Sequence, residues 1–472
     1  MKHDFLNHPQ ADGDVQDVYV GKDHFGRDWS NKTRSRFWRG AHLSRRVFFQ
    51  SMSAAVGGYF LLPTQQATAQ TVSGGGRAKN VIFVFLNGAP SHTDTFDLKV
   101  GAWTPAYFNP TTYGNILWPQ GLMPKLAEQM DSIAVVRSVR AWATAHGIAQ
   151  SWAQLARNPA NALARLAPHI GSVISLELGA KDRTLPAFMS LNIANGPSEG
   201  YLKPEHAPMY ISPGGGGLPG ATHPDGGEAV FNRRYDLSLS LDTDLRAEAR
   251  YGESTEDFVT FNASARKLMY NPRVSSIFTF DQAQRNLYGN NGFGNACITA
   301  RNLLRANMGT RFIQITLGGW DQHTNIYGNN ANLQVTTRTL DNGLGPLIAD
   351  LKQDGLLDET LIVVMGEFGR TVGAVNEQNG RDHHPQQAVL FAGAGIRGRN
   401  AIGLTNATGA FVTEPGWTMN REVRAEDIGA TIYSALGIDW TKIRRDYPLG
   451  RGFEYIPGAE HGEYVPIKDL WG

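Results

Sequence analysis

The sequence contains one cysteine, almost no net charge and no long apolar run. Cys297 is the single thiol among 472 residues, which excludes an internal disulfide and a zinc site built from several thiolates. Any metal site must therefore use Asp, Glu and His side chains. The 44 basic and 43 acidic residues nearly cancel, so the composition gives no general attraction to nucleic acid, and we expect no nucleic-acid partner.

The most apolar segment near the N-terminus, 51–63, has about 13 residues, whereas a bilayer span needs about 20. It follows the basic pair in SRRVFFQ (44–50) and precedes ATAQ (67–70). This order is typical of a twin-arginine export signal, although Phe49 and Gln50 replace the usual Leu and Lys. We expect residues 1–69 to be the signal. The rest would pass through the twin-arginine machinery to the periplasm or beyond, with no membrane span in the mature chain.

Three segments share one design, in which an apolar run enters a turn that carries acidic or imidazole groups. They are NVIFVFLNGAPSHTDTFD (80–97), RFIQITLGGWDQH (311–323) and LIVVMGEFGRT (361–371). Uninterrupted runs of this length predict strands that are buried on both faces. Helical patterns at 334–353 and 425–437 alternate with them. The pattern predicts an α/β fold, a three-layer αβα sandwich with a largely parallel central sheet.

In such sheets, ligands bind beyond the carboxyl ends of the strands, where these turns lie. The loop GRDHHP (380–385) adds an acid and two histidines just before another apolar run. Imidazole and carboxylate ligands favour zinc, with calcium, magnesium and manganese as alternatives, so we expect one or two divalent cations. Each candidate alone would be a solvated or turn-capping residue, and their shared edge is what indicates a metal. The candidate ligands are Asp321, His323, Glu367, His383 and His384.

The motifs GWDQH, GEFGRT and GRDHHP, in this order and spacing, resemble the bacterial family called domain of unknown function 1501. These are exported proteins of the alkaline phosphatase and sulfatase superfamily. The resemblance covers most of residues 70–472 and implies an alkaline phosphatase-like fold. It implies an ester hydrolase more loosely, because one fold hosts many functions. Carried over to this sequence, the layout makes Asp321 and His323 ligands of one metal, and His383 or His384 takes the late-histidine position.

Two positions depart from the superfamily layout. Glu367 and Phe368 stand where the superfamily has an Asp-His pair, and Asn87 stands where it has a bridging Asp. The departure at Phe368 could leave one of the two metal positions incomplete. At the second departure, Asp94 or His92 could substitute for the bridging Asp as a ligand.

The resemblance also implies a nucleophile at a helix start downstream of the first strand, where the helix dipole and the metal would activate it. An apolar run at 132–139 leads into such a helix start, with Thr144 as the candidate and His146 beside it. The structural alternative for Thr144 is an N-cap. Ser91 is a weaker candidate, and a water molecule is another. CITAR, which contains Cys297, lacks the proline of the formylglycine motif and lies in a helical pattern, so we assign this thiol to the core.

Two arginines, Arg370 and Arg381, could clamp an anionic group bidentately. The alternative is that they stabilise the fold as partners of Glu367 and Asp382. The clamp would fit a small anionic ester, or a sulfated or phosphorylated glycan.

A Gly- and Pro-rich insertion near 195–240 is predicted to have little regular structure. It is a candidate flap over the site, and a plain surface loop is the alternative. His206, His223 and Asp225 lie in it, and we do not predict them as ligands. The stretch 242–308 is predicted to be mainly helical.

Two functions are consistent with these patterns. The first is an exported metal-dependent hydrolase of a phosphate or sulfate ester, with Thr144, His146 and Arg370 as catalytic residues. The alternative is a non-catalytic binding or assembly protein of the same fold that keeps a structural metal. The acid and histidine clusters favour the hydrolase, whereas Asn87, Phe368 and the uncertain nucleophile favour the alternative.

Overall fold

The computed structural model describes residues 77–160, 166–179, 184–193, 196–222, 226–241, 243, 262–328, 332–446 and 452–471. The chain divides into two units, Met1–Gln70 and Thr71–Gly472, and the described residues belong to the second. The segment 1–69, His223 and Asp225 lie outside the described residues. Across the helices that are described, none is both long and apolar enough to cross a membrane.

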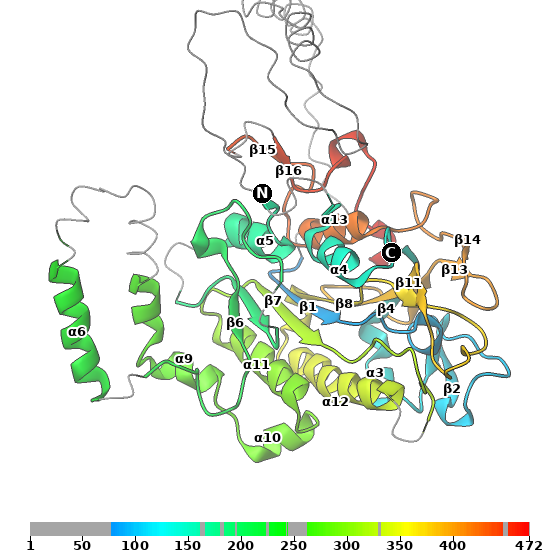
Figure 1. The fold of residues 1–472 in the computed structure, drawn as a ribbon, viewed down its shortest axis with the longest axis horizontal. Helices are drawn as coiled ribbons and strands as arrows, with labels where there is room; N and C mark the ends of the chain where they lie inside the picture. Colours follow the sequence, from blue (N-terminus) through cyan, green and yellow to red (C-terminus); the bar gives the residue numbers. More distant parts are fainter. Residues whose placement is uncertain are drawn as a thin grey trace, which may run out of the picture. The chain divides into compact units, whose positions relative to one another are not determined.

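An eight-stranded sheet forms the centre of the second unit (Figure 1). Seven strands are parallel, and β11 is antiparallel to both of its neighbours. In spatial order the strands are β12 (Asn400–Ile402), β4 (Ile133–Arg140), β11 (Gln386–Gly393), β8 (Thr360–Met365), β1 (Asn80–Leu86), β7 (Phe312–Leu317), β5 (Phe188–Leu191) and β6 (Met209–Ile211).

Strand β1 shows why the sheet is covered on both faces. Successive side chains of a strand point to opposite faces, and here both sets are apolar. Ile82 and Val84 join one hydrophobic core, and Val81 and Phe83 join the other. Burying each such side chain stabilises the fold by about 1.5–3 kcal/mol, so β1 requires helices on both faces.

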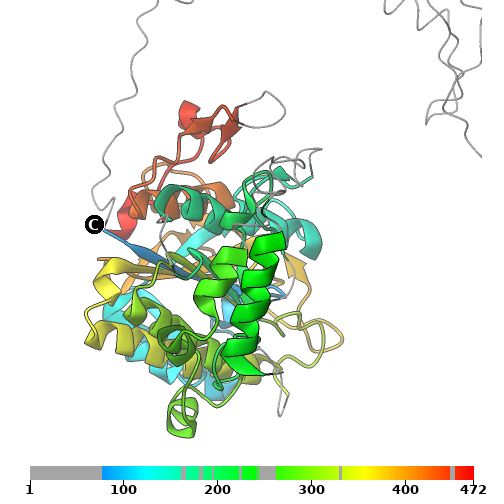
Figure 2. The same ribbon diagram turned by 90° about the vertical axis from the view of Figure 1, so that its left-hand side faces the viewer.

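The helices meet this requirement in two layers, visible in both views (Figure 1, Figure 2). The first core contains residues of α11 (Gly292–Ala306), α12 (Asn332–Gln353) and the short α3 (Pro124–Ala127), and the second contains residues of α4 (His146–Leu155), α5 (Ile170–Leu178) and α13 (Ala425–Ala435). The remaining helices include α6 (Gly227–Leu241), α9 (Pro272–Ile277) and α10 (Gln282–Leu287). The small two-stranded sheets pair β2 (Pro110–Tyr113) with β3 (Ile116–Pro119), β9 (Gly369–Arg370) with β10 (His383–His384), β13 (Leu404–Thr405) with β14 (Val412–Glu414), and β15 (Ile443–Arg444) with β16 (Phe453–Glu454).

The predicted three-layer αβα architecture with a largely parallel sheet is confirmed. The apolar runs at 80–86, 311–317 and 361–365 correspond to β1, β7 and β8 to within one residue, and the helical patterns at 334–353 and 425–437 correspond to α12 and α13.

The Gly- and Pro-rich insertion has more regular structure than its composition predicts. Met209–Ile211 forms β6, which pairs with β5 at the sheet edge, and Gly227–Leu241 forms α6. The expectation of little regular structure was wrong here, because the glycines concentrate at 214–217 and 226–227. The segments before the first cluster and after the second keep β-branched, aromatic and charged residues that form a strand and a helix.

Candidate metal centre

One edge of the sheet collects acidic and imidazole side chains because of the strand directions. Strands β1, β4, β7 and β8 are parallel, so the segments that follow them leave at the same carboxyl edge. The antiparallel strand β11 begins at this edge, since Gln386 pairs with Arg140 at the end of β4. The residues of β10, which directly precede β11, therefore meet the turns after the parallel strands.

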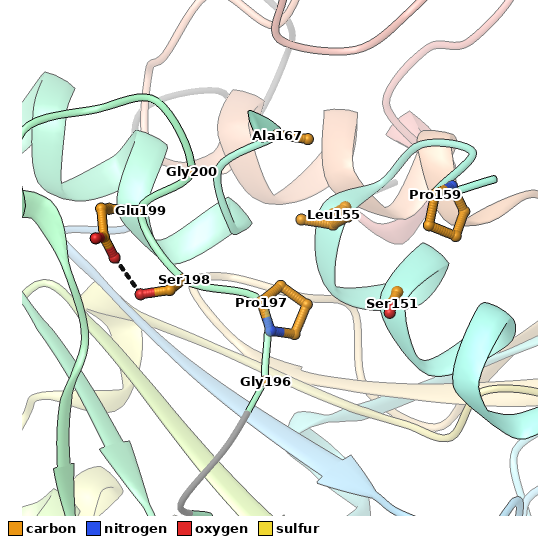
Figure 3. Close-up of a pocket in the computed structure, with 9 residues that line it drawn as sticks. All are labelled: Ser151, Leu155, Pro159, Ala167, Gly196, Pro197, Ser198, Glu199 and Gly200. Carbon is orange, nitrogen blue, oxygen red and sulfur yellow. Dashed lines mark hydrogen bonds between the residues drawn. The ribbon is translucent and has the colours of Figure 1, made fainter. Parts of the chain in front are cut away.

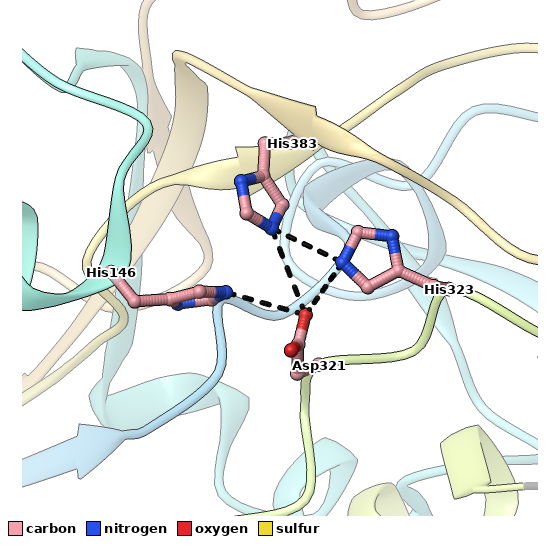
Figure 4. Close-up of side chains that lie close together, drawn as sticks. All are labelled: His146, Asp321, His323 and His383. Atoms are coloured by element: carbon pink, nitrogen blue, oxygen red, sulfur yellow. Dashed lines mark hydrogen bonds and ion pairs between the residues drawn. The ribbon is translucent and has the colours of Figure 1, made fainter.

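Four side chains converge at this edge (Figure 4). His146 begins α4, Asp321 and His323 follow β7, and His383 lies in β10. One nitrogen or oxygen atom from each lies within 4.8 Å of the corresponding atoms of the other three. We call these four residues the ligand cluster.

The separations within the ligand cluster suit a tetrahedral metal ion. With metal–ligand bonds of about 2.0–2.1 Å, ligand atoms of a tetrahedral zinc site lie about 3.3 Å apart. The Nε2 atoms of His323 and His383 are 3.1 Å apart. Asp321 Oδ1 lies 2.9 Å from His323 Nε2, 3.3 Å from His146 Nε2 and 3.8 Å from His383 Nε2. The four side chains are 27% to 50% exposed, so the cluster is open to solvent.

Hydrogen bonds fix the tautomer of all three imidazoles. Each Nδ1 faces an oxygen that can only accept, so Nδ1 carries the hydrogen and Nε2 presents a lone pair to the cluster. The acceptors are Glu367 Oε1 for His146 at 2.8 Å, Asp382 Oδ1 for His323 at 2.8 Å and the Thr144 main-chain oxygen for His383 at 2.7 Å. Nε2 of His146 is buried, and no described residue forms a hydrogen bond with it. Lone pairs converging in this way repel each other unless a cation lies between them.

The charges around the cluster also favour a cation. The site has three carboxyl groups, those of Asp321, Glu367 and Asp382, beside one guanidinium, that of Arg370. Carboxyl groups therefore outnumber guanidinium groups by two. Arg370 donates to Asp321 Oδ1 at 2.5 Å and lies 3.2 Å from His323 Nε2, whose single lone pair can go either to this guanidinium or to a cation. Partial burial opposes ionisation of Asp321, but the hydrogen bond and charge of Arg370 hold the pKa of Asp321 below its ordinary value. The hydrogen bond from His323 lowers the pKa of Asp382. A divalent cation would neutralise this excess.

Two glycines allow the turns to approach each other this closely. Gly88 has a φ of +113°, and a Cβ there would lie 2.5 Å from the main-chain nitrogen of Asp321. A Cβ on Gly380 would collide with the main chain of His323. Any larger residue at either position would separate the turns that carry the cluster.

Two predicted site residues, Glu367 and Arg370, lie behind the cluster with fully buried side chains. Glu367 contacts His146 Nδ1, and it is not one of the four clustered residues. Arg370 also donates to the main-chain oxygens of Gly88, Ala89 at 2.8 Å and Arg381 at 3.0 Å. Its guanidinium therefore holds the turns around Asp321 together by hydrogen bonds.

The structure does not bring Asp94, His92 and His384 into the cluster. Asp94 forms a buried ion pair with Arg381 at 2.7 Å and accepts a hydrogen bond from Ser91 Oγ at 2.6 Å. The rings of His92 and His384 stack at 6.0 Å. His384 points away from His383 because neighbouring strand residues face opposite sides. Burial lowers the pKa of His92 to about 3 and also lowers that of His384.

Thr144 contributes a main-chain atom to the site. Its carbonyl oxygen holds His383, and the N-cap of α4 is Ala145. His146, which we predicted as a partner of Thr144, is instead the first residue of α4 and one of the four clustered residues.

Sequence reasoning missed two residues of the site, Asp382 as an anchor of His323 and Gln150. Gln150 donates to Asn87 Oδ1 at 2.6 Å and to Glu367 Oε1 at 3.2 Å. A signal for it was present, because Gln150 lies four residues after His146 and so shares its helix face.

Residues 78–456 match the family described as protein of unknown function (DUF1501). The chain belongs to this family. No curated protein matches it.

Several solved structures are similar to this DUF1501 chain at low identity. One is a protein in the alkaline phosphatase superfamily from Vibrio parahaemolyticus, with 11% identity, 78% of this chain and 71% of that chain covered, and a TM-score of 0.35. Another is the PsFucS1 sulfatase from Pseudoalteromonas sp., with 12% identity, coverages of 77% and 68%, and a TM-score of 0.37. A third is the C-terminal periplasmic domain of EcEptC from Escherichia coli in complex with zinc, with 10% identity, coverages of 84% and 96%, and a TM-score of 0.36. Such low TM-scores assign no activity.

The DUF1501 chain also has a cavity of about 500 Å³ beside α4 (Figure 3). Ser151 and Leu155 of α4 line one side, and Pro197, Ser198 and Glu199 of the Gly- and Pro-rich stretch line another. Part of this stretch thus faces the helix that begins with His146, and its role as a flap stays a prediction.

Proposed function

We propose that this DUF1501 protein is an exported hydrolase of a phosphate or sulfate ester that uses one zinc ion. The observation that supports the proposal best is the convergence of three Nε2 lone pairs and one carboxylate oxygen at a partly exposed site. A ligand set rich in imidazole favours zinc over calcium and magnesium, which prefer oxygen. The exposed side of the cluster leaves access for an ester.

The proposal is limited to one cation because of the residues beside the cluster. The Phe368 ring centroid lies 4.9 Å from that of His146 and 4.7 Å from that of His383. An apolar side chain that cannot bind a metal therefore lies where the superfamily layout has a histidine. Asn87 is neutral, and its Oδ1 accepts from Gln150. Neither residue offers the charge that a second cation would need.

A bound zinc ion would act as a Lewis acid toward an ester oxygen and would make a water molecule more acidic. The chain's own contribution is to hold the ligand atoms. Glu367, Asp382 and the Thr144 carbonyl orient the imidazoles, and Arg370 fixes Asp321. Thr144 lies before Ala145, the N-cap of α4, and so outside the helix start where a hydroxyl would be activated, and we favour water over its hydroxyl as the nucleophile.

The second candidate is a non-catalytic binding or assembly protein with a structural cation. The full burial of Arg370 favours it, because all of this guanidinium's contacts are to the chain and none is left for a substrate anion. The two candidates make different predictions for turnover.

The test is metal analysis of the purified protein by mass spectrometry, followed by hydrolysis assays with p-nitrophenyl phosphate and p-nitrophenyl sulfate. We expect one zinc ion per chain and turnover, both lost in His323→Ala. The matched control, His384→Ala, removes a neighbouring imidazole outside the cluster and should retain both. Zinc without turnover on any ester supports the second candidate, and a protein that binds no metal contradicts both.

Export is tested separately by changing the basic pair. Arg45→Lys combined with Arg46→Lys should leave the protein in the cytoplasm in cell fractionation, since twin-arginine signals require both arginines. Unchanged secretion of the double variant would contradict this route.

A further inference from the structure

The carboxylate of Glu367 has one fully bonded oxygen and one without a partner. Oε1 accepts from the Gly88 main-chain nitrogen at 3.0 Å, from His146 Nδ1 at 2.8 Å and from Gln150 Nε2 at 3.2 Å. Oε2 is buried, in a side chain that is 0% exposed, and has no hydrogen-bond partner among the described residues. A buried carboxylate oxygen in this state is costly and needs a donor.

A second acceptor without a partner lies nearby on β11. Oε1 of Gln387 is buried and has no hydrogen-bond partner in the part of the chain that the structure describes, while its Nε2 donates to the main-chain oxygen of Glu367 at 3.4 Å. Glu367 and Gln387 line the same small cavity between α4 and β11. The other lining residues are Ala141, Trp142, Ala143, Ala149, Trp152, Ala153, Met365 and Ala425.

The size and lining of this cavity limit what can bind there. It offers about 10 Å³ of free space, close to the roughly 10–15 Å³ that one water molecule needs. The alanines and Met365 provide no polar side chain. Both indole N–H groups already donate hydrogen bonds elsewhere, because Trp142 and Trp152 donate to Glu426 at 3.0 and 2.7 Å. A cation such as calcium would require about six oxygens, and among the described lining side chains only Glu367 and Gln387 have a buried oxygen without a partner. The ligand must therefore be small and neutral, with two hydrogens to donate.

We propose that one buried water molecule bridges Glu367 Oε2 and Gln387 Oε1. Each hydrogen of the water satisfies one of the two acceptors. The bridge connects β11 through Glu367 to His146, so Gln387 is a positioning residue for the imidazole that Glu367 orients. The effect on metal binding rests on the proposed zinc centre, whereas the water site itself does not.

The first test is a high-resolution crystal structure of the unmodified protein, prepared with and without zinc. We expect density for one water between the two oxygens in both preparations. Its absence from both would overturn the proposal. Its presence in a protein that binds no zinc would retain the water site and contradict only the metal centre, so the two failures are distinguishable.

The second test is Gln387→Met, which keeps side-chain length and removes the acceptor together with the Nε2 donor to the Glu367 main-chain oxygen. We expect the water to be lost and zinc affinity to fall, by less than the roughly 10-fold lost when a direct outer-shell partner of a metal ligand is removed. The matched control is Gln386→Met on the opposite face of β11, where Gln386 Nε2 donates to the main-chain oxygens of Arg137 and Val139, both at 2.9 Å. An equal loss of affinity in both variants would overturn the positioning role.

Discussion

His383 donates its Nδ1 hydrogen to the main-chain oxygen of Thr144, 2.7 Å away and 239 residues earlier in the chain. This bond turns Nε2 toward Asp321 and His323. Burial first, and then the charge of Arg370, lower the pKa of His383, so its neutral, metal-binding form is favoured. Because the acceptor is a main-chain atom, the Thr144 side chain is dispensable for this contact.

We therefore expect Thr144→Ala to keep nearly all of the zinc affinity, far from the roughly 10- to 100-fold loss seen when an outer-shell partner is removed. Isothermal titration calorimetry checks this, with His383→Ala as the variant that should lose binding. If Thr144→Ala kept zinc but lost turnover entirely, the hydroxyl and not water would be the nucleophile.

Asp382 holds Nδ1 of His323, and the variant that separates its charge from its hydrogen bond is Asp382→Asn. The amide oxygen can still accept, but the negative charge that complements the cation is lost. We expect zinc affinity to fall about 10-fold, and more in Asp382→Ala, within the range for outer-shell partners. His384→Ala should leave the affinity unchanged. Equal affinities in Asp382→Ala and the unmodified protein would contradict the role of Asp382 in orienting His323.

Arg370 should matter for stability more than for substrate binding. Arg370→Met leaves buried carbonyls of Gly88, Ala89 and Arg381 without a donor. We expect the free energy of unfolding to fall by about 3–5 kcal/mol, since each buried carbonyl left without a donor costs about 1–3 kcal/mol, and urea denaturation measures this loss. The control, Arg399→Met, removes an exposed ion pair with Asp131 and should cost less than about 1 kcal/mol. A higher KM with unchanged stability in Arg370→Met would restore its role as a substrate clamp.

The apolar runs were sufficient to predict which strands bring the site together. β1, β7 and β8 are buried on both faces, and parallel strands of this kind release their turns at one edge. For this reason Asp321, His323 and His383 could be expected to meet although long stretches of chain separate them, and the structure brings them together.

Other parts of the site depend on geometry that residue types do not encode. The sequence HH cannot show which imidazole of β10 faces the cluster, since this depends on the register of Gly369 and Arg370 opposite it. The helix start at His146 was recognisable, but not the direction of its side chain. Asp94 was indistinguishable from a ligand because its partner, Arg381, lies 287 residues away.

The last prediction concerns His169, which lies outside the ligand cluster and caps α5. Its Nδ1 accepts from the Gly171 main-chain nitrogen at 2.8 Å, so the cap requires the neutral ring. Burial lowers the pKa of His169 from 6.5 to about 3. Between these values the unfolded chain binds one more proton than the folded chain, so stability decreases as the pH falls below 6.5.

The contribution of His169 is at most about 1.4 kcal/mol per pH unit in this window. His169→Asn retains a capping oxygen without titrating. It should lower stability at neutral pH, because the His169 ring packs against Phe188 with ring centroids 4.8 Å apart. It should also flatten the dependence of the unfolding free energy on pH between about 6.5 and 3. Urea denaturation at several pH values measures this slope separately from the loss of stability at neutral pH. An unchanged slope would mean that His169 is protonated in the folded protein.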